Sequence, residues 1–221
     1  MAFTEVDVEA RPEARAELAR LGVPLLPAVV VGARAVYGWN PAAVAELVGV
    51  RYADGPRLSV PELGSRLDRV LAAGGRAMAA AGPAHLDLRH PQRDRTLRQL
   101  GYHVFRLTLA FRDAMIERRL PAAWLKEAAP AALADGPAIA RYGESVRDAL
   151  RAWLARPDAA AGVVETDYGP QDGHALLERT VWHAAQHVRQ LYALLTTAGV
   201  DPGEALTEAD LADLPLPRAL W

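Results

Sequence analysis

Four long segments carry apolar residues at spacings of three and four, and this pattern constrains the fold more than any other feature. They cover about residues 59–82, 93–119, 137–154 and 173–198. Apolar residues at these spacings share one face of an α-helix, and that face must be buried against another element. A Ser59–Glu62 capping box marks the start of the first segment. The pattern predicts a mostly α protein with a four-helix bundle over residues 59–221.

The first fifty residues follow a different pattern. Residues 3–8 alternate apolar and polar as a strand would, and residues 12–21 have helical spacing. Two short apolar runs flank a turn at residues 32–34, and Asn40 followed by proline is typical of a helix start. We therefore expect a small β-α-β-β-α module over residues 1–50 and a linker over residues 51–58. A loop is expected over residues 158–172.

The composition excludes several classes of function. The net charge is −2 with the two signs interspersed, and no basic run with interleaved aromatic residues indicates a nucleic-acid surface. No apolar stretch is long enough for a bilayer, and the first residues do not resemble a signal peptide, so we expect a cytoplasmic protein without membrane contact. The chain has no cysteine. Thiolate metal sites and cysteine nucleophiles are thereby excluded.

Three histidines occupy inward positions of two predicted helices. His183 and His187 lie four residues apart in the last segment, which puts them on one helix face about 6 Å apart at Cβ. His103 lies three residues after Leu100 and four before Leu107 on the second segment. Three neutral imidazoles can bind a divalent transition metal and leave one position open for water or substrate. Such a site suits zinc, nickel, iron or copper. The alternative is that the buried histidines satisfy one another through water.

Neighbouring residues extend this site. Trp182 could border a pocket beside His183, and Arg179 would suit a carboxylate on a small substrate. Metal-binding imidazoles usually donate their second N–H to an acceptor, for which Glu178 and Gln186 are candidates. The remaining histidines, His85, His90 and His174, are expected at the surface.

Residues 59–221 resemble the DinB-like superfamily of four-helix bundles, which includes bacillithiol and mycothiol S-transferases and the mycothiol-dependent maleylpyruvate isomerase. The resemblance lies in residues 97–104 (LRQLGYHV), 178–191 (ERTVWHAAQHVRQL) and 211–217 (LADLPLP). In that superfamily, one histidine of the second helix and the HxxxH pair of the fourth bind a divalent metal. The resemblance implies this ligand role for His103, His183 and His187.

Residues 1–50 resemble the later part of a glutaredoxin. The matching segments are residues 3–8 (FTEVDV), 26–32 (LPAVVVG) and 38–41 (GWNP). The resemblance implies a cis peptide bond before Pro27 beside a thiol substrate, and a carboxylate-binding region at the helix start marked by Asn40. The strand and helix that would carry the redox cysteines are absent, so disulfide exchange is excluded. Such a partial module would dock on the bundle or on a second chain, or belong to a truncated start.

Together these patterns give a leading hypothesis and an alternative. The leading one is a metal-dependent transferase or hydrolase that activates a low-molecular-weight thiol or a water at the three histidines, with Pro27, Asn40, Trp182 and Arg179 as substrate contacts. The alternative is a non-catalytic binding or regulatory protein, in which metal stabilises the bundle and the N-terminal module supplies an interaction or homodimer surface. Both predict a metal ion, and neither predicts a nucleic acid.

Overall fold

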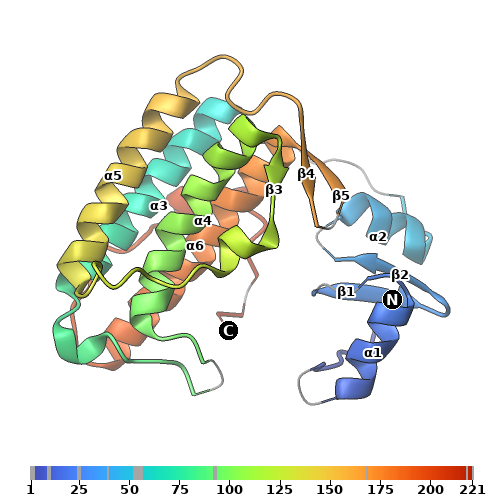
Figure 1. Ribbon diagram of the computed structural model, residues 1–221, viewed down its shortest axis with the longest axis horizontal. Coiled ribbons are helices and arrows are strands. Elements are labelled where there is room, and N and C mark those ends of the chain that lie inside the picture. Colours follow the sequence, from blue (N-terminus) through green and yellow to red (C-terminus); the bar gives the residue numbers. More distant parts are fainter. Residues whose placement is uncertain are drawn as a thin grey trace. The chain divides into compact units, whose positions relative to one another are not determined.

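The computed structural model describes residues 3–8, 11–23, 26–38, 40–51, 57–91, 94–167, 169–217 and 219–220. The chain divides into two compact units, Met1–Arg57 and Leu58–Trp221. We call them the N-terminal unit and the helical unit. Most of the regular structure is α-helix, so the predicted mostly α class is confirmed (Figure 1).

The N-terminal unit contains a β-hairpin with a helix packed on it. Strands β1 (Ala28–Val31) and β2 (Arg34–Tyr37) pair antiparallel, with Val29 opposite Val36. Helix α1 (Pro12–Arg20) precedes them, and α2 (Pro41–Val48) follows and packs against both strands. The Asn40 side chain accepts a hydrogen bond from the Ala43 amide at 3.1 Å, which is the N-cap predicted for this helix.

The strand predicted at residues 3–8 is not formed, so the order is α-β-β-α. Period-two alternation produces a strand where one face is buried against other residues. Of the three apolar residues in this segment only Val8 is buried, whereas Phe3 is 89% exposed and Val6 is 42% exposed, so pairing would gain little further apolar burial. Most of the predicted linker, residues 52–56, lies outside the described residues.

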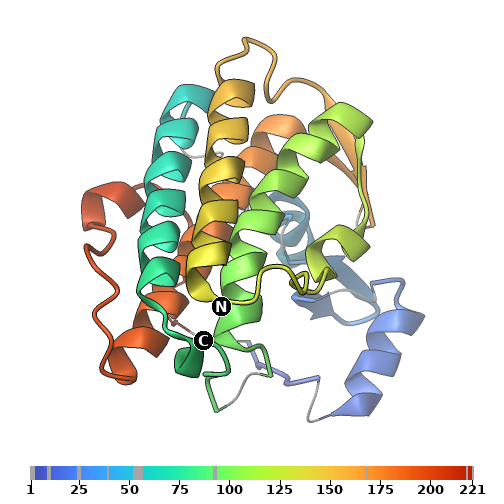
Figure 2. The same ribbon diagram turned by 60° about the vertical axis from the view of Figure 1, so that its left-hand side comes forward.

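Four long helices lie side by side in the helical unit (Figure 2). They are α3 (Val60–Ala80), α4 (Leu97–Glu117), α5 (Gly136–Leu154) and α6 (Gly173–Thr197). Helices α3 and α4 each pack against both α5 and α6. The capping box at the start of α3 is present, with the Ser59 amide donating to a Glu62 carboxylate oxygen at 2.7 Å. Short 3-10 helices occur at Pro83–His85 and Ala122–Lys126.

The inner faces of these helices meet in one apolar core. Its largest fully buried side chains are Phe105, Phe111, Leu63, Leu67, Leu71, Met78, Leu97, Ile139, Leu150, Leu177, Leu191 and Leu195. At one helix contact the Phe105 ring lies against Gly143, where an added Cβ would overlap the ring. Close contacts of this kind hold the helices in one arrangement, because the side chains of a close-packed core can pack in few other ways.

The loop predicted over residues 158–172 contains two strands instead. Strand β4 (Val163–Thr166) pairs antiparallel with β5 (Gly169–Asp172) and parallel with β3 (Arg119–Leu120). Val164 is fully buried in the core. The prediction was wrong because β5 reads Gly-Pro-Gln-Asp, which has no apolar alternation, and because β3 is too short to show a pattern.

The chain after α6 folds back along the helical unit. It includes the short helix α7 (Glu208–Leu211), and Asp210 pairs with Arg69 of α3 at 2.6 Å. Leu214 is buried in the core. Among the described residues, every helix is either too short or too polar to cross a membrane.

Candidate metal centre

Helix α4 positions His103 toward the core. The helix begins at a Thr96–Gln99 capping box, in which the Gln99 amide donates to Thr96 Oγ1 at 3.3 Å. Leu100, Val104 and Leu107 are buried on the same helix, and His103 itself is only 7% exposed. The apolar face of α4 therefore carries this imidazole into the interior of the helical unit.

Helix α6 positions the other two histidines. Asp172 caps its start by accepting hydrogen bonds from the backbone amides of His174 and Ala175, both at 3.1 Å. His183 and His187 follow in the middle of the helix, beside the buried Ala184 and Val188. The spacing of four residues places both imidazoles on one side of α6, as the sequence predicts.

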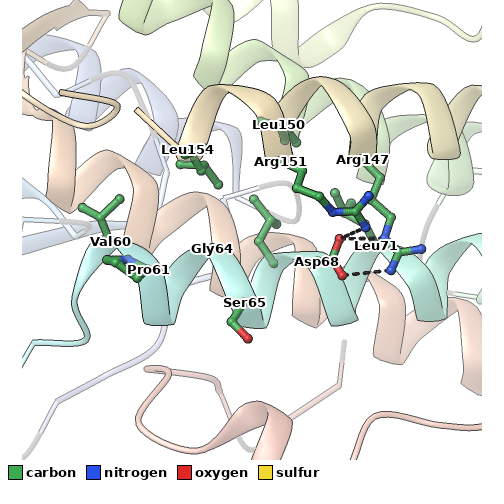
Figure 3. Close-up of a pocket in the computed structure, with 12 residues that line it drawn as sticks. Val60, Pro61, Gly64, Ser65, Asp68, Leu71, Arg147, Leu150, Arg151 and Leu154 are labelled. Carbon is green, nitrogen blue, oxygen red and sulfur yellow. Dashed lines mark hydrogen bonds and ion pairs between the residues drawn. The ribbon is translucent and has the colours of Figure 1, made fainter. Parts of the chain in front are cut away.

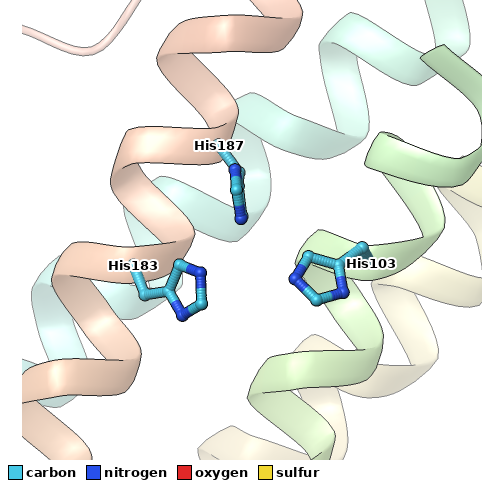
Figure 4. A group of neighbouring side chains, drawn as sticks. All are labelled: His103, His183 and His187. Atoms are coloured by element: carbon cyan, nitrogen blue, oxygen red, sulfur yellow. The ribbon is translucent and has the colours of Figure 1, made fainter. Parts of the chain in front are cut away.

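The structure brings the three predicted ligands together. His183 and His187 extend from α6 toward His103 on α4 (Figure 4). Their ring centroids are 4.7 Å apart, and the His103 ring lies 5.8 Å from His183 and 5.1 Å from His187. One ring nitrogen of each residue lies within 4.8 Å of the others. In a tetrahedral site with bonds of about 2.0–2.1 Å, ligand nitrogens are about 3.4 Å apart. The upper bound of 4.8 Å includes this spacing.

Burial keeps all three imidazoles neutral near neutral pH. It is the main cause that lowers the pKa of His103 and His183 far below the usual value. Burial also lowers the pKa of His187 to about 4, against the opposing effect of a hydrogen bond with Gln190. The Arg95 guanidinium lowers all three pKa values further. Neutral imidazoles keep the lone pair that a metal ion requires.

One of these nitrogens has no hydrogen-bond partner in the part of the chain that the structure describes. His187 Nδ1 lies 2.7 Å from Gln190 Oε1, whereas Nε2 of the same ring is buried with no hydrogen-bond partner among the described residues. Leaving a buried polar group unpaired costs about 1–3 kcal/mol. An exogenous ligand at the cluster would remove that cost.

Of the four predicted substrate contacts, two lie beside this cluster. The Trp182 ring is buried and its centroid lies 5.8 Å from that of His183. Arg179 precedes His183 by four residues on α6, so the two side chains share one face of the helix. The charge of Arg179 also lowers the pKa of His183. The other two, Pro27 and Asn40, belong to the N-terminal unit.

In the N-terminal unit, both residues have structural contacts of their own. The Leu26–Pro27 peptide bond is cis, as the glutaredoxin resemblance implied, and the Pro27 carbonyl accepts a hydrogen bond from Gly38 at 2.8 Å. The Asn40 side chain caps α2. Trp39, within the third matching segment, lies outside the described residues. Substrate contact by any of the four residues stays a prediction.

Two residues near the site were missed from the sequence. Gln190, rather than Gln186 or Glu178, is the residue hydrogen-bonded to His187. Its position three residues after a ligand on the same helix was the available signal. The other is Arg95, which forms no ion pair or hydrogen bond within the described part of the chain, and whose position before α4 gave no signal. His174 is also not simply solvated, since its Nε2 lies 2.9 Å from the Leu58 carbonyl oxygen.

No family model matches the chain, and comparisons with curated proteins and with solved structures give no significant match. Three imidazoles from two helices, with no carboxylate in the group, form a neutral ligand set that could hold a metal ion.

Proposed function

We propose that this protein is a metal-dependent enzyme of the DinB-like superfamily, a transferase or hydrolase that activates a low-molecular-weight thiol or a water at His103, His183 and His187. The observation that carries the proposal is the convergence of three neutral imidazoles with the unpaired Nε2 of His187 among them. The arrangement of the four long helices supports a four-helix bundle of that superfamily's type. A bound divalent ion would supply Lewis acidity that lowers the pKa of a thiol or water.

The charge around the site favours an anionic substrate. The three histidines are neutral ligands and do not offset the charge of a dication, so a thiolate or hydroxide suits the remaining position. Arg95 and Arg179 add positive charge close enough to lower histidine pKa values. A carboxylate-bearing substrate would be attracted to the same place. Trp182 would shield one side of it from water.

The choice of a thiol depends on the N-terminal unit. Its hairpin and its capped helix α2 support the interpretation that this unit is a remnant of a thiol-binding fold. In such a fold Pro27 and Asn40 would contact the substrate.

Two measurements test the proposal. Elemental analysis of protein purified without chelators should find stoichiometric zinc, nickel or iron, and a three-imidazole site allows each of them. Consumption of a small thiol by an electrophile should then be faster with the metal-loaded protein than with His103→Ala. Asp68→Asn, a polar change outside the cluster, is the matched control and should retain the activity.

The outcomes separate the two hypotheses. Equal background rates for the wild-type protein and His103→Ala, with metal bound only to the former, would favour the non-catalytic binding or regulatory protein. Absence of stoichiometric metal from the wild-type protein would contradict both.

A further inference from the structure

One side of α6, next to the histidines, is hydrogen-bonded to the end of the chain. Three side chains donate to backbone carbonyls of Pro217, Ala219 and Leu220, which we call the C-terminal segment. Gln186 Nε2 donates to Ala219 at 3.1 Å and to Leu220 at 2.8 Å. Arg189 donates to Pro217 at 3.1 Å, and Gln190 Nε2 donates to Leu220 at 2.7 Å. Gln190 is thus shared between the segment and His187.

The hydrogen-bond partners of the Gln190 side chain determine which of its two amide atoms is the nitrogen and which is the oxygen. A backbone carbonyl can only accept, so the Gln190 atom next to the Leu220 oxygen must be its amide nitrogen. The Gln190 oxygen is then the atom 2.7 Å from His187 Nδ1, and it can only accept. His187 Nδ1 must therefore carry a proton. A neutral imidazole has one N–H, so its Nε2 presents a lone pair.

We infer that Gln190 is a positioning residue that couples the C-terminal segment to the histidine cluster, by holding His187 in the tautomer whose Nε2 lone pair belongs to the cluster. The functional side of this inference rests on the proposed metal site. Withdrawal of electron density from Nε2 by a ligand makes the Nδ1 proton a stronger donor, which tightens the contact with Gln190. By linkage, a docked segment must then favour ligand binding, and a bound ligand must favour docking of the segment.

Three variants separate the contact of Gln190 with His187 from its contact with Leu220. Gln190→Leu removes both the bond to His187 and the bond to Leu220. Gln190→Glu keeps an acceptor for His187 Nδ1 and loses the donor to Leu220. Gln186→Leu is the matched control, because Gln186 also donates to Leu220 and contacts no histidine through a hydrogen bond within the described chain. Thermal melts followed by circular dichroism verify that each variant folds.

The tautomer can be measured without any metal. Nitrogen-15 NMR of the metal-free protein should find the His187 proton on Nδ1 in the wild type, in Gln186→Leu and in Gln190→Glu. In Gln190→Leu, the Nε2-protonated form should appear. A proton on Nε2 in the wild type, or an unchanged tautomer in Gln190→Leu, would overturn the inference whether or not metal binds.

The coupling is measured with zinc. Chelator competition should give about 10–100-fold weaker zinc binding for Gln190→Leu, the size typical of losing an outer hydrogen-bond partner of a ligand, and a smaller change for Gln186→Leu. Zinc should slow hydrogen exchange of the Ala219 and Leu220 amides in the wild type and not in Gln190→Glu. Equal zinc affinity in the wild type and Gln190→Leu would overturn the inference and leave the metal site intact. A wild-type protein that binds none of zinc, nickel and iron would overturn the proposed function, and the tautomer measurement would still decide the inference.

Discussion

Between α3 and α5, Asp68 accepts hydrogen bonds from Arg147 and Arg151, whereas between α4 and α6 three histidines face one another with no carboxylate in their group. Figure 3 shows the first cluster. The Asp68 carboxylate accepts hydrogen bonds of 2.7–2.8 Å from the two guanidinium groups. Each of its charged groups has an oppositely charged partner within the protein. The histidine cluster, by contrast, contains an atom without a partner. His187 Nε2 is buried and has no hydrogen bond within the described residues. A polar cluster that is incomplete on its own is the better candidate for a ligand site.

The pH dependence of stability should separate the two clusters most strongly. The three histidines have folded pKa values below the unfolded value near 6.5, so the native state binds fewer protons, and stability must fall as pH falls below 6.5. Each histidine contributes a slope of about 1.4 kcal/mol per pH unit, down to about pH 4 for His187. Urea unfolding of the metal-free protein from pH 7 to pH 5 measures the slope.

The Asp68 cluster should contribute nothing to that slope. Hydrogen bonding to Arg147 lowers the pKa of Asp68 below 3.8, so its stabilisation is complete above that pH and is lost only in stronger acid. Asp68→Asn should therefore leave the slope between pH 7 and pH 5 unchanged. A flat stability profile in this range for the wild type would contradict the burial of three neutral histidines.

The next largest effect is the loss of zinc-dependent stabilisation in His183→Ala. Zinc at about 100 times its dissociation constant should stabilise the wild-type protein by about 2.7 kcal/mol. The variant lacks one ligand of the cluster and should show no such gain. Urea unfolding with and without zinc gives both values, and an equal gain in the variant would mean that zinc binds elsewhere.

Breaking the complete cluster should have a smaller effect and none on zinc. Asp68→Ala leaves two guanidinium groups without their shared carboxylate and should cost about 1 kcal/mol, since the site is partly solvated. Its zinc affinity should equal that of the wild type. A change in zinc affinity would show that the two clusters are coupled through the core.

The smallest effect is expected at the exposed side of the same cluster. The Arg151 side chain is 55% exposed, and exposed ion pairs contribute little. Arg151→Ala should change the unfolding free energy by no more than about 0.5 kcal/mol. A larger loss would mean that Arg147 does not neutralise Asp68 by itself.

The helical unit was predictable because its signals are local and repeated. The spacing of apolar residues along residues 59–82 and the Ser59–Glu62 capping box predicted α3, and the structure shows both. The histidine cluster followed from the same periodicity, because His103, His183 and His187 lie at inward positions of their helices.

Features that depend on distant pairing were not predictable. Strand β3 has two residues and exists through its pairing with β4, some forty-five positions away. The contact of Gln190 with Leu220 likewise depends on how the chain returns after α6. At residues 3–8 the opposite error occurred, since alternation does not form a strand where most of the apolar side chains stay exposed.

The central claim is tested most directly by a zinc titration. The wild-type protein is first freed of metal with a chelator and is then titrated with zinc in competition with a chromogenic chelator. The three-histidine centre predicts one equivalent of tightly bound zinc in the wild type and none in His103→Ala, with both proteins folded. A wild-type protein that leaves the chelator fully loaded, or a His103→Ala variant that binds zinc equally well, would contradict it.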